Sequence, residues 1–396
     1  MIPVGLAAFD PAAFLPRGPL HRPAIVAPAP RQVSYGQVSG KVSAGTAFVV
    51  VKVNGVVRAR GRPVRRRFRF SIALPPRDVR VRVEAIGALG KRRARVVRPV
   101  YGLPRSARPR GPRGTVEDPV LASRVRTLAR GYSGTAAAYV EDLRSRRGAA
   151  WNARARFPAA STIKVAIALE VLRTLHGQPA PGSSLDRLLR EMLVHSDNAA
   201  ANALLTWLGG STSYGAAAVN ESLRSLGIYD TLMYGGYVLG TAAARPIPLR
   251  VDEQPAIGIG KYTTAFDLAR LHRCVYLASA GRGPAVRLAG SFTGADARYL
   301  MWILAHVADP GKLDRYLPAR LPVLHKAGWI GQARHDAGIV FWRGGAYVAA
   351  VTTWNSFGAG LSSDVLAGRV AATALRRYQV LREADASTSA DATATA

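Results

Sequence analysis

The sequence predicts two folded regions of different class: a small all-β region, followed by an α+β domain. Apolar residues that alternate with basic ones predict the β region, and helical apolar spacing between two groups of strands predicts the α+β domain. The chain has 396 residues, of which 48% are hydrophobic. That is enough apolar material for a core in each region.

The all-β prediction covers residues 33–100. Phe68, Phe70 and Ile72 alternate with arginine or serine, and the same period recurs from Val79 to Val83. Period two places the apolar set on one face of a strand. Asn54-Gly55 is the usual pair for a tight hairpin turn. Five or six short strands in about 70 residues are typical of a small immunoglobulin-like sandwich.

Two segments flank this β region. Residues 1–32 contain seven prolines and no periodic pattern, which predicts a disordered leader. Residues 101–118 are rich in proline, glycine and arginine and predict an extended linker.

The α+β prediction covers residues 119–384, and a disordered tail is expected over 385–396. Because strands are expected near both ends of this segment, a single sheet should be completed by both ends. The expected elements follow in chain order: a helix at 119–130, strands at 133–142 and 148–152, helices at 161–176, 185–208, 214–226 and 264–280, strands at 323–331, 336–343 and 346–354, and a helix at 362–384.

The composition excludes several classes of protein. The formal net charge is +31, but 48 of the 55 basic residues are arginine and two-thirds of the excess lies in residues 31–113. This pattern favours a solvated, arginine-rich face over a nucleic-acid enzyme. The single Cys274 excludes a disulfide framework or a cysteine-cluster zinc site. No apolar stretch is long enough to predict a membrane helix, and the leader is a poor match to a secretion signal.

Ser161-Thr162-Ile163-Lys164 is the first motif that indicates chemistry. Residues three apart share a helix face, so Lys164 is expected one turn beyond Ser161. A serine hydroxyl needs a nearby base to become a nucleophile, and a buried lysine with a lowered pKa can act as that base. Arginine could not, because it stays protonated in proteins. A lysine here is informative because the chain has only seven.

Two further motifs follow along the chain. Ser196-Asp197-Asn198 lies 35 residues after Ser161, and Lys326-Ala327-Gly328 lies on a predicted strand. Each alone has an ordinary structural explanation, a helix cap for the first and an edge-strand lysine for the second. In this order and on these elements, the three motifs match the signature set of class A β-lactamases and penicillin-binding proteins.

Residues 119–384 therefore resemble the class A β-lactamase-like serine hydrolases. The resemblance implies an antiparallel sheet flanked by helices plus an all-helical lobe. It implies that Ser161 is acylated, that Lys164 is its base and that Ser196 relays a proton to the leaving nitrogen. The substrate-binding positions that it implies are Asn198, Lys326, Ala327, Gly328 and Trp329, and the backbone N–H groups of Ser161 and Trp329 would form the oxyanion hole.

The sequence departs from this family in three ways. Ala327 has no hydroxyl for a substrate carboxylate. The interval from Ser161 to Ser196 is shorter than is typical. The deacylating glutamate is absent from its expected place, and Glu253 is the best candidate to replace it, with Asp230 and Asp252 the other acids of that region.

Three functions follow as alternatives. The first is hydrolysis of a β-lactam or related amide, and the second is a penicillin-binding D,D-peptidase that acts on cell-wall peptide with slow deacylation. The third is a catalytically silent binding protein, anchored to an anionic envelope polymer by its basic sandwich. The family implies an extracytoplasmic location and neither metal nor organic cofactor. A Ser-His-Asp triad with His335-Asp336 is less favoured, because Lys164 already supplies a base.

Overall fold

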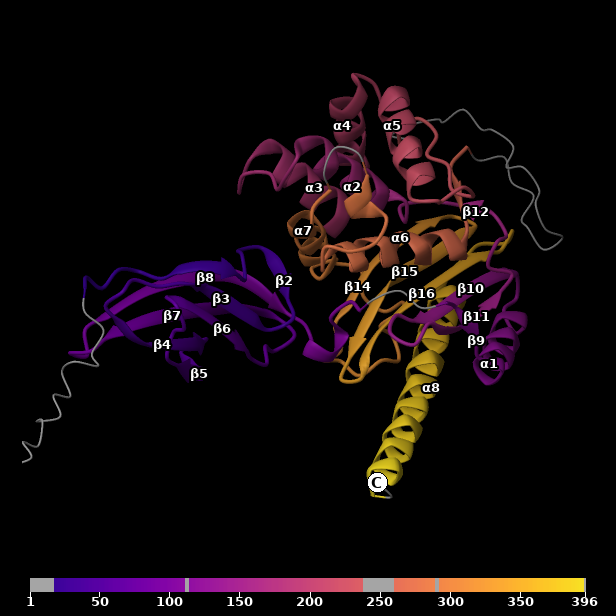
Figure 1. Ribbon diagram of the computed structural model, residues 1–396. Coiled ribbons are helices and arrows are strands. Elements are labelled where there is room, and N and C mark those ends of the chain that lie inside the picture. Colours follow the sequence, from indigo (N-terminus) through magenta and orange to yellow (C-terminus); the bar gives the residue numbers. More distant parts are fainter. Residues whose placement is uncertain (1–17, 111–113, 238–259, 289–291, 395–396) are drawn as a thin grey trace, which may run out of the picture. The chain divides into compact units, whose positions relative to one another are not determined.

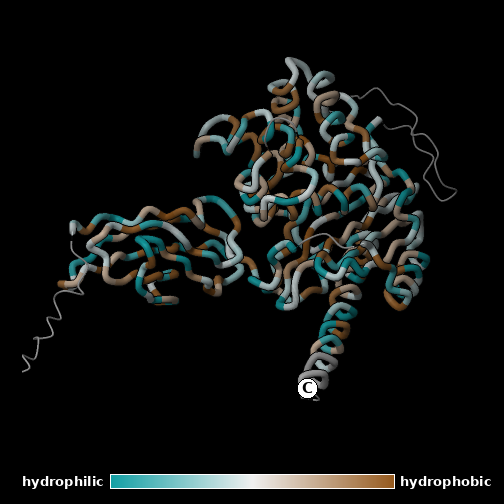
Figure 2. The backbone as a smooth tube through the Cα atoms, in the orientation of Figure 1, coloured by the Kyte–Doolittle hydropathy of each residue, from teal (hydrophilic) through white to brown (hydrophobic). Residues whose placement is uncertain are grey.

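The computed structural model describes residues 18–110, 114–237, 260–288 and 292–394. The chain divides into two compact units, one ending at Leu103 and the other beginning at Pro104. Hydrophobic residues occur along the strands of both units (Figure 2). No helix among the described residues is both long and apolar enough to cross a membrane.

The first unit is all-β, as predicted. One sheet has the strand order β1-β3-β6, and the other has the order β2-β8-β7-β4-β5. Their bounds are β1 Ala24–Ala27, β2 Gln32–Ser34, β3 Gln37–Lys41, β4 Thr46–Val53, β5 Val56–Gly61, β6 Arg67–Ser71, β7 Asp78–Gly87 and β8 Arg92–Gly102.

The alternation seen in the sequence explains this core. Val79, Val81 and Val83 are buried in it, while Arg80 between them is exposed. Asn54 and Gly55, which connect β4 and β5, both have positive φ, as a two-residue hairpin turn requires. The immunoglobulin type of the unit remains a prediction.

The second unit is built on one six-stranded sheet with the order β14-β15-β16-β10-β11-β9. Strand β10 from the beginning of the unit pairs with β16 from its end, which confirms that both ends complete the sheet. Every pair is antiparallel except β9 with β11. The bounds are β9 Val116–Glu117, β10 Thr135–Asp142, β11 Arg147–Trp151, β14 Val323–Ile330, β15 Ala333–Trp342 and β16 Gly345–Trp354.

Helices cover both faces of this sheet. Helices α1 (Pro119–Arg130) and α8 (Leu361–Ala394) pack on one face, where their apolar residues share a core with β10 and β16. Helix α6 (Ala265–Ala278) lies against the opposite face (Figure 1). The helical lobe adds α2 Lys164–Leu175, α3 Ser184–Val194, α4 Asn198–Gly209, α5 Thr212–Ser225 and α7 Gly294–Leu304, with the short strands β12 Phe157–Pro158 and β13 Tyr262–Thr263 and the 3-10 helix η3 Ala285–Arg287.

Three sequence predictions about local structure need correction. The single helix expected over 185–208 is two helices, because the chain breaks at Ser196, which has φ 59°. Helix α7 was not expected. The helix expected from Ser161 begins at Lys164.

The predicted leader, linker and tail are also partly wrong. Strand β1 lies within residues 1–32, because pairing with β3 orders it. The 3-10 helix η2 Arg105–Ala107 lies within 101–118, and Ala107 is buried, with its carbonyl accepting from Tyr276. Helix α8 continues through the alanine-rich tail to Ala394, consistent with the high helix propensity of alanine.

Candidate active site

Ser161 lies in the tight turn that leads into α2. Strand β12 brings the chain to this turn by pairing with β13, and Ala160 adopts a left-handed conformation with φ 46°. The Lys164 amide donates to the Ser161 carbonyl over 3.2 Å, which places the two residues one turn apart as predicted. Ser161 itself is half-buried.

Lys164 is completely buried. Its Nζ donates to the Ser196 carbonyl over 2.6 Å and to Asn198 Oδ1 over 2.7 Å. Burial, followed by repulsion from Lys326, lowers the Lys164 pKa to about 7. A buried lysine that exchanges its proton near neutral pH meets the requirement for a general base.

Ser196 connects the two lysines of the site. It occupies the break between α3 and α4 in a left-handed conformation, which costs a non-glycine residue about 1–3 kcal/mol. Asp197 caps α4 by accepting from the Ala200 amide, and this fixes the break. As a result, the Ser196 carbonyl faces Lys164 while its hydroxyl accepts from Lys326 Nζ over 3.0 Å.

Lys326 is also completely buried, on β14 at the edge of the sheet. Burial lowers its pKa to about 8, although Asp309 and Asp336 oppose that change. Two residues further on, Gly328 lies directly against the turn that carries Ser161. A Cβ at Gly328 would stand 2.5 Å from the Ser161 amide nitrogen, so only glycine allows this approach. The close approach brings β14 beside Ser161.

The two residues next to Gly328 differ in accessibility. Ala327 is buried and offers no hydroxyl, whereas Trp329 is 62% exposed. A tryptophan is more often part of a core, but the exposed side chain of Trp329 excludes that role.

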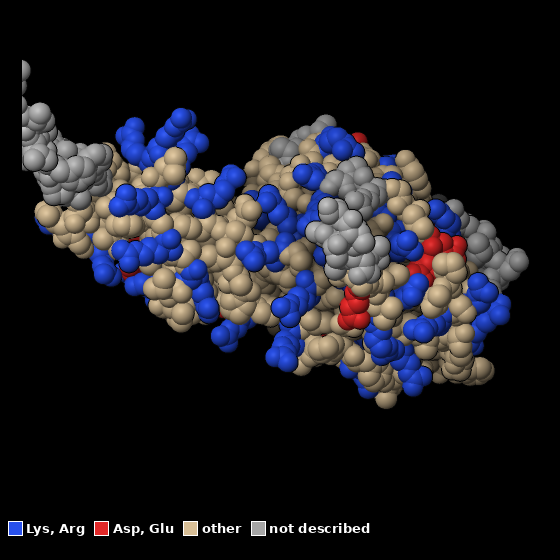
Figure 3. Space-filling view, turned by 60° about the horizontal axis from the view of Figure 1, so that its bottom comes forward, with Lys and Arg blue, Asp and Glu red and all other residues tan. Residues whose placement is uncertain are grey.

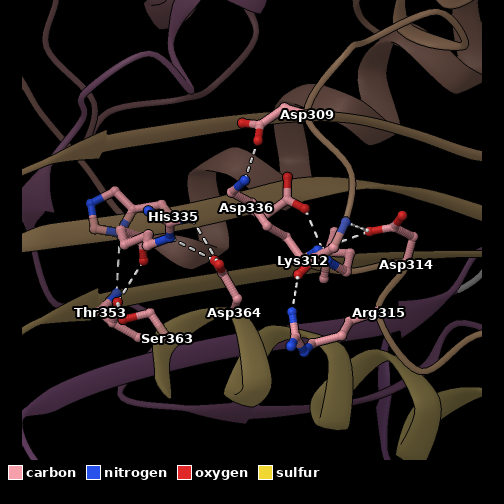
Figure 4. Close-up of polar contacts among 12 residues, drawn as sticks. Asp309, Lys312, Asp314, Arg315, His335, Asp336, Thr353, Ser363 and Asp364 are labelled. Atoms are coloured by element: carbon pink, nitrogen blue, oxygen red, sulfur yellow. Dashed lines mark hydrogen bonds and ion pairs between the residues drawn. The ribbon is translucent and has the colours of Figure 1, made fainter. Parts of the chain in front are cut away.

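His335 and Asp336 do not form a triad with Ser161. His335 Nε2 donates to the Pro158 carbonyl, and its Nδ1 accepts from the Thr353 amide. Burial lowers the His335 pKa to about 4, so the ring stays neutral. Asp336, on the opposite face of β15, accepts from the Leu313 amide (Figure 4). His335 therefore ties β12 to the sheet and does not activate a serine.

Asp336 also pairs with His325, which lies on the face of β14 opposite to Lys326. His325 Nδ1 is 2.8 Å from Asp336 Oδ2. Burial alone would lower the His325 pKa, but the carboxylate outweighs burial and raises it.

Of the acids named as candidates for the deacylating base, only Asp230 lies among the described residues. Glu253 and Asp252 lie outside the described residues. Asp230 is buried and forms an ion pair with Arg156 over 3.0 Å.

The structure adds three residues that the sequence interpretation missed: Asn202, Tyr237 and Lys261. The Tyr237 ring covers Lys164, with Nζ 4.4 Å from the ring centroid, and Lys261 Nζ is 5.0 Å from the same centroid. Burial lowers the Lys261 pKa to about 8. The scarcity of lysine could have indicated Lys261, and Asn202 follows Asn198 by one helical turn.

The second unit matches a family model described as "Beta-lactamase enzyme family" over residues 120–180 and 177–378. The chain belongs to the beta-lactamase enzyme family. This match lies within the second unit. No curated protein matches the chain.

Solved structures agree with this beta-lactamase assignment at the level of fold. A structure of PBP-A is 21% identical to this chain, with a TM-score of 0.54. The match covers 67% of this chain and 98% of the PBP-A chain. A class A beta-lactamase from Bacteroides cellulosilyticus is 20% identical, with a TM-score of 0.51. The match covers 66% of this chain and 97% of that beta-lactamase. A beta-lactamase from Sphaerobacter thermophilus is 19% identical, with a TM-score of 0.50 and the same shares covered. The second unit therefore has the β-lactamase fold.

Proposed function

We propose that the protein is a serine hydrolase whose nucleophile, Ser161, is acylated by a β-lactam or a related cell-wall amide. The observation that carries this proposal is the continuous polar arrangement behind Ser161. Lys164 lies one turn away with a pKa near neutrality, and it contacts Ser196, whose hydroxyl is held by Lys326. A silent binding protein would not need two completely buried lysines joined by a strained serine, because burying a cation is costly.

Acylation would proceed in two steps. Neutral Lys164 accepts the hydroxyl proton of Ser161 as Oγ forms a bond to the carbonyl carbon, and the N–H groups of Ser161 and Trp329 stabilise the oxyanion. The C–N bond then breaks, and the leaving nitrogen takes a proton through the Ser196 hydroxyl. An ester on Ser161 and a free amine result, and Lys164 regains its neutral form by returning its proton along this path.

Substrate binding would use the groups that remain around the nucleophile. Asn198 gives Oδ1 to Lys164, so its Nδ2 is left to donate to a substrate carbonyl. Lys326 would attract a substrate carboxylate, but Ala327 offers no hydroxyl beside it. We therefore expect weaker binding of penicillin-type carboxylates than a threonine or serine at this position would give.

These substrates place the action of the protein outside the cytoplasm. The reaction requires no organic cofactor, since every step uses side-chain and backbone groups of the chain. Among the residues that the structure describes, no group of three or more histidine, cysteine or acidic side chains could hold a metal ion.

A fluorescent penicillin tests the proposal. The full chain should form one covalent adduct per molecule, visible on a denaturing gel and by intact mass, and Ser161→Ala should form none. The matched control is Ser184→Ala, which changes a serine at the first turn of α3. Equal labelling of wild type and Ser161→Ala would contradict the proposal.

The first unit supports a second function, binding of an anionic envelope polymer. A groove of about 490 Å³ on this unit is lined by Lys41, Arg62, Arg67 and Arg69 together with Phe68 and Phe70. All four cations are exposed, and no acidic residue lines the groove. Figure 3 shows basic side chains spread over the visible surface with few acidic ones among them. Closely spaced cations beside apolar surface suit a polymer of repeating phosphate groups.

This binding is tested with poly(glycerol phosphate) and the full chain. Affinity should weaken steeply with salt, because exposed charges are screened. Replacing Arg62 and Arg67 by glutamine should weaken it about tenfold or more. The control replaces Arg124 and Arg190, two exposed arginines of the second unit, and removes the same charge. If both double variants lose affinity equally, net charge rather than the groove controls binding.

A further inference from the structure

Tyr237 is fixed over the catalytic lysine by an unusual number of contacts. Asn202 on α4 makes two hydrogen bonds to its backbone: the Tyr237 amide donates to Oδ1 over 2.5 Å, and Nδ2 donates to the Tyr237 carbonyl over 2.7 Å. The phenol donates to the carbonyl of Ala160, the residue before Ser161, over 3.1 Å. Tyr237 thus links α4 to the turn that carries Ser161.

Two lysine side chains lie against this ring. Lys164 and Lys261 are 4.4 and 5.0 Å from its centroid, within the range of a cation–π interaction. Lys261 is held there by its hydrogen bond to the Gly236 carbonyl, 2.5 Å away. The ring is therefore held by its side chain as well as by its backbone.

The position of the ring has a consequence for the second half of the reaction. To hydrolyse the acyl ester, water must form a bond to the carbonyl carbon while the bond to Ser161 Oγ breaks. One water proton passes to a base, and Ser161 Oγ regains a proton. The water and its base must therefore stand beside Lys164 and Ser161. In this structure, the Tyr237 ring lies against Lys164, and its phenol reaches the carbonyl of Ala160, the residue before Ser161.

Among the described residues, no carboxylate is hydrogen-bonded to the Lys164 amine. The hydrogen-bond partners of the Lys164 amine are the Ser196 carbonyl and Asn198 Oδ1, neither of which is a base. The Asp197 carboxylate caps α4, and Glu170 accepts from Arg173 and Ser222. The phenol of Tyr237 is also unsuitable, because burial raises its pKa and its hydrogen is already donated to Ala160.

We propose that Tyr237, positioned by Asn202, occupies the place where a deacylating base would act and so makes the acyl-enzyme long-lived. This inference rests on the proposed function, since it requires acylation of Ser161. It favours the peptidase-like alternative over a turnover β-lactamase.

The experiment is stopped-flow kinetics of the full chain with a chromogenic cephalosporin. Wild type should give a burst of about one equivalent and then nearly stop. Tyr237→Glu should keep the burst and hydrolyse the ester at least tenfold faster, because a carboxylate would then face the site beside two lysines. Tyr237→Phe keeps the ring over Lys164, so its deacylation should stay slow. The matched control is Tyr229→Glu, which changes a 71% exposed tyrosine in the same way and should keep wild-type kinetics.

A second variant keeps the test decisive where Tyr237→Glu fails to fold. Asn202→Ala removes both backbone hydrogen bonds, and it should shorten the acyl-enzyme lifetime by threefold or more without loss of burst amplitude, as followed by intact mass. Steady wild-type turnover that Glu253→Gln abolishes would overturn the inference, and so would equal lifetimes for wild type, Tyr237→Glu and Asn202→Ala. Absence of any burst in wild type would instead refute the proposed function.

Discussion

The pH dependence of acylation tests the central role given to Lys164. A pKa of about 7 means that half of the Lys164 amines are neutral at pH 7. An exposed lysine with a pKa near 10.4 would have only about one in 2,500 amines neutral at that pH, a difference of roughly 5 kcal/mol in protonation free energy. Burial of Lys164 therefore accounts for almost all of the neutral amine that can accept a proton at pH 7.

The direction of the profile follows from the two lysines. Below pH 7 Lys164 is protonated, so acylation should fall about tenfold for each pH unit. Above pH 8 Lys326, with a pKa of about 8, loses its charge and attracts a substrate carboxylate less strongly. We therefore expect the acylation rate constant at low substrate concentration to peak between pH 7 and 8. An esterified substrate without the carboxylate should lose the alkaline fall and keep the acidic one.

The assay is the rate of covalent labelling by a penicillin between pH 5 and 9.5. Lys164→Arg keeps the positive charge but cannot give up its proton, so labelling at pH 7.5 should fall about 1,000-fold. Lys91→Arg, on the exposed surface of the first unit, is the matched control. A flat profile, or a Lys164→Arg rate within threefold of wild type, would refute the assignment of Lys164 as the base.

Three further substitutions test the site. Gly328→Ala places a Cβ 2.5 Å from the Ser161 amide nitrogen, so labelling by penicillin should fall at least 100-fold. Denaturant unfolding should show a loss of about 1–3 kcal/mol in unfolding free energy. Unchanged labelling would contradict the close approach of Gly328 to Ser161. His335→Ala leaves the Pro158 carbonyl and the Thr353 amide without a partner, and should cost ~3 kcal/mol of unfolding free energy; a lost labelling activity at wild-type stability would instead support the triad. Ser196→Ala should slow labelling about 100-fold with the acidic midpoint still near pH 7, and a shifted midpoint would mean that its hydroxyl tunes Lys164.

Local pattern was sufficient to predict the sheet and the three motifs. The strands were visible because buried faces repeat every two residues, and Val79 to Val83 obey that rule. Ser161 and Lys164 were predicted one turn apart because their separation is local. The break at Ser196 was missed because apolar spacing continues on both sides of it, and only the tertiary contacts of Ser196 with Lys164 and Lys326 explain its strained backbone.

The sequence by itself predicted the family, from three motifs in a fixed order, and Ser161 as the candidate nucleophile, because each depends on residue type and short spacing. Only the tertiary structure decided which residues surround the motif residues. Tyr237 lies against Lys164, and Asn202 and Lys261 contact Tyr237, from segments up to 97 positions away from Lys164 along the chain. The periodicity of the sequence does not predict such contacts. Likewise, burial in the folded unit, rather than the motif, brings the pKa of Lys164 close to neutrality.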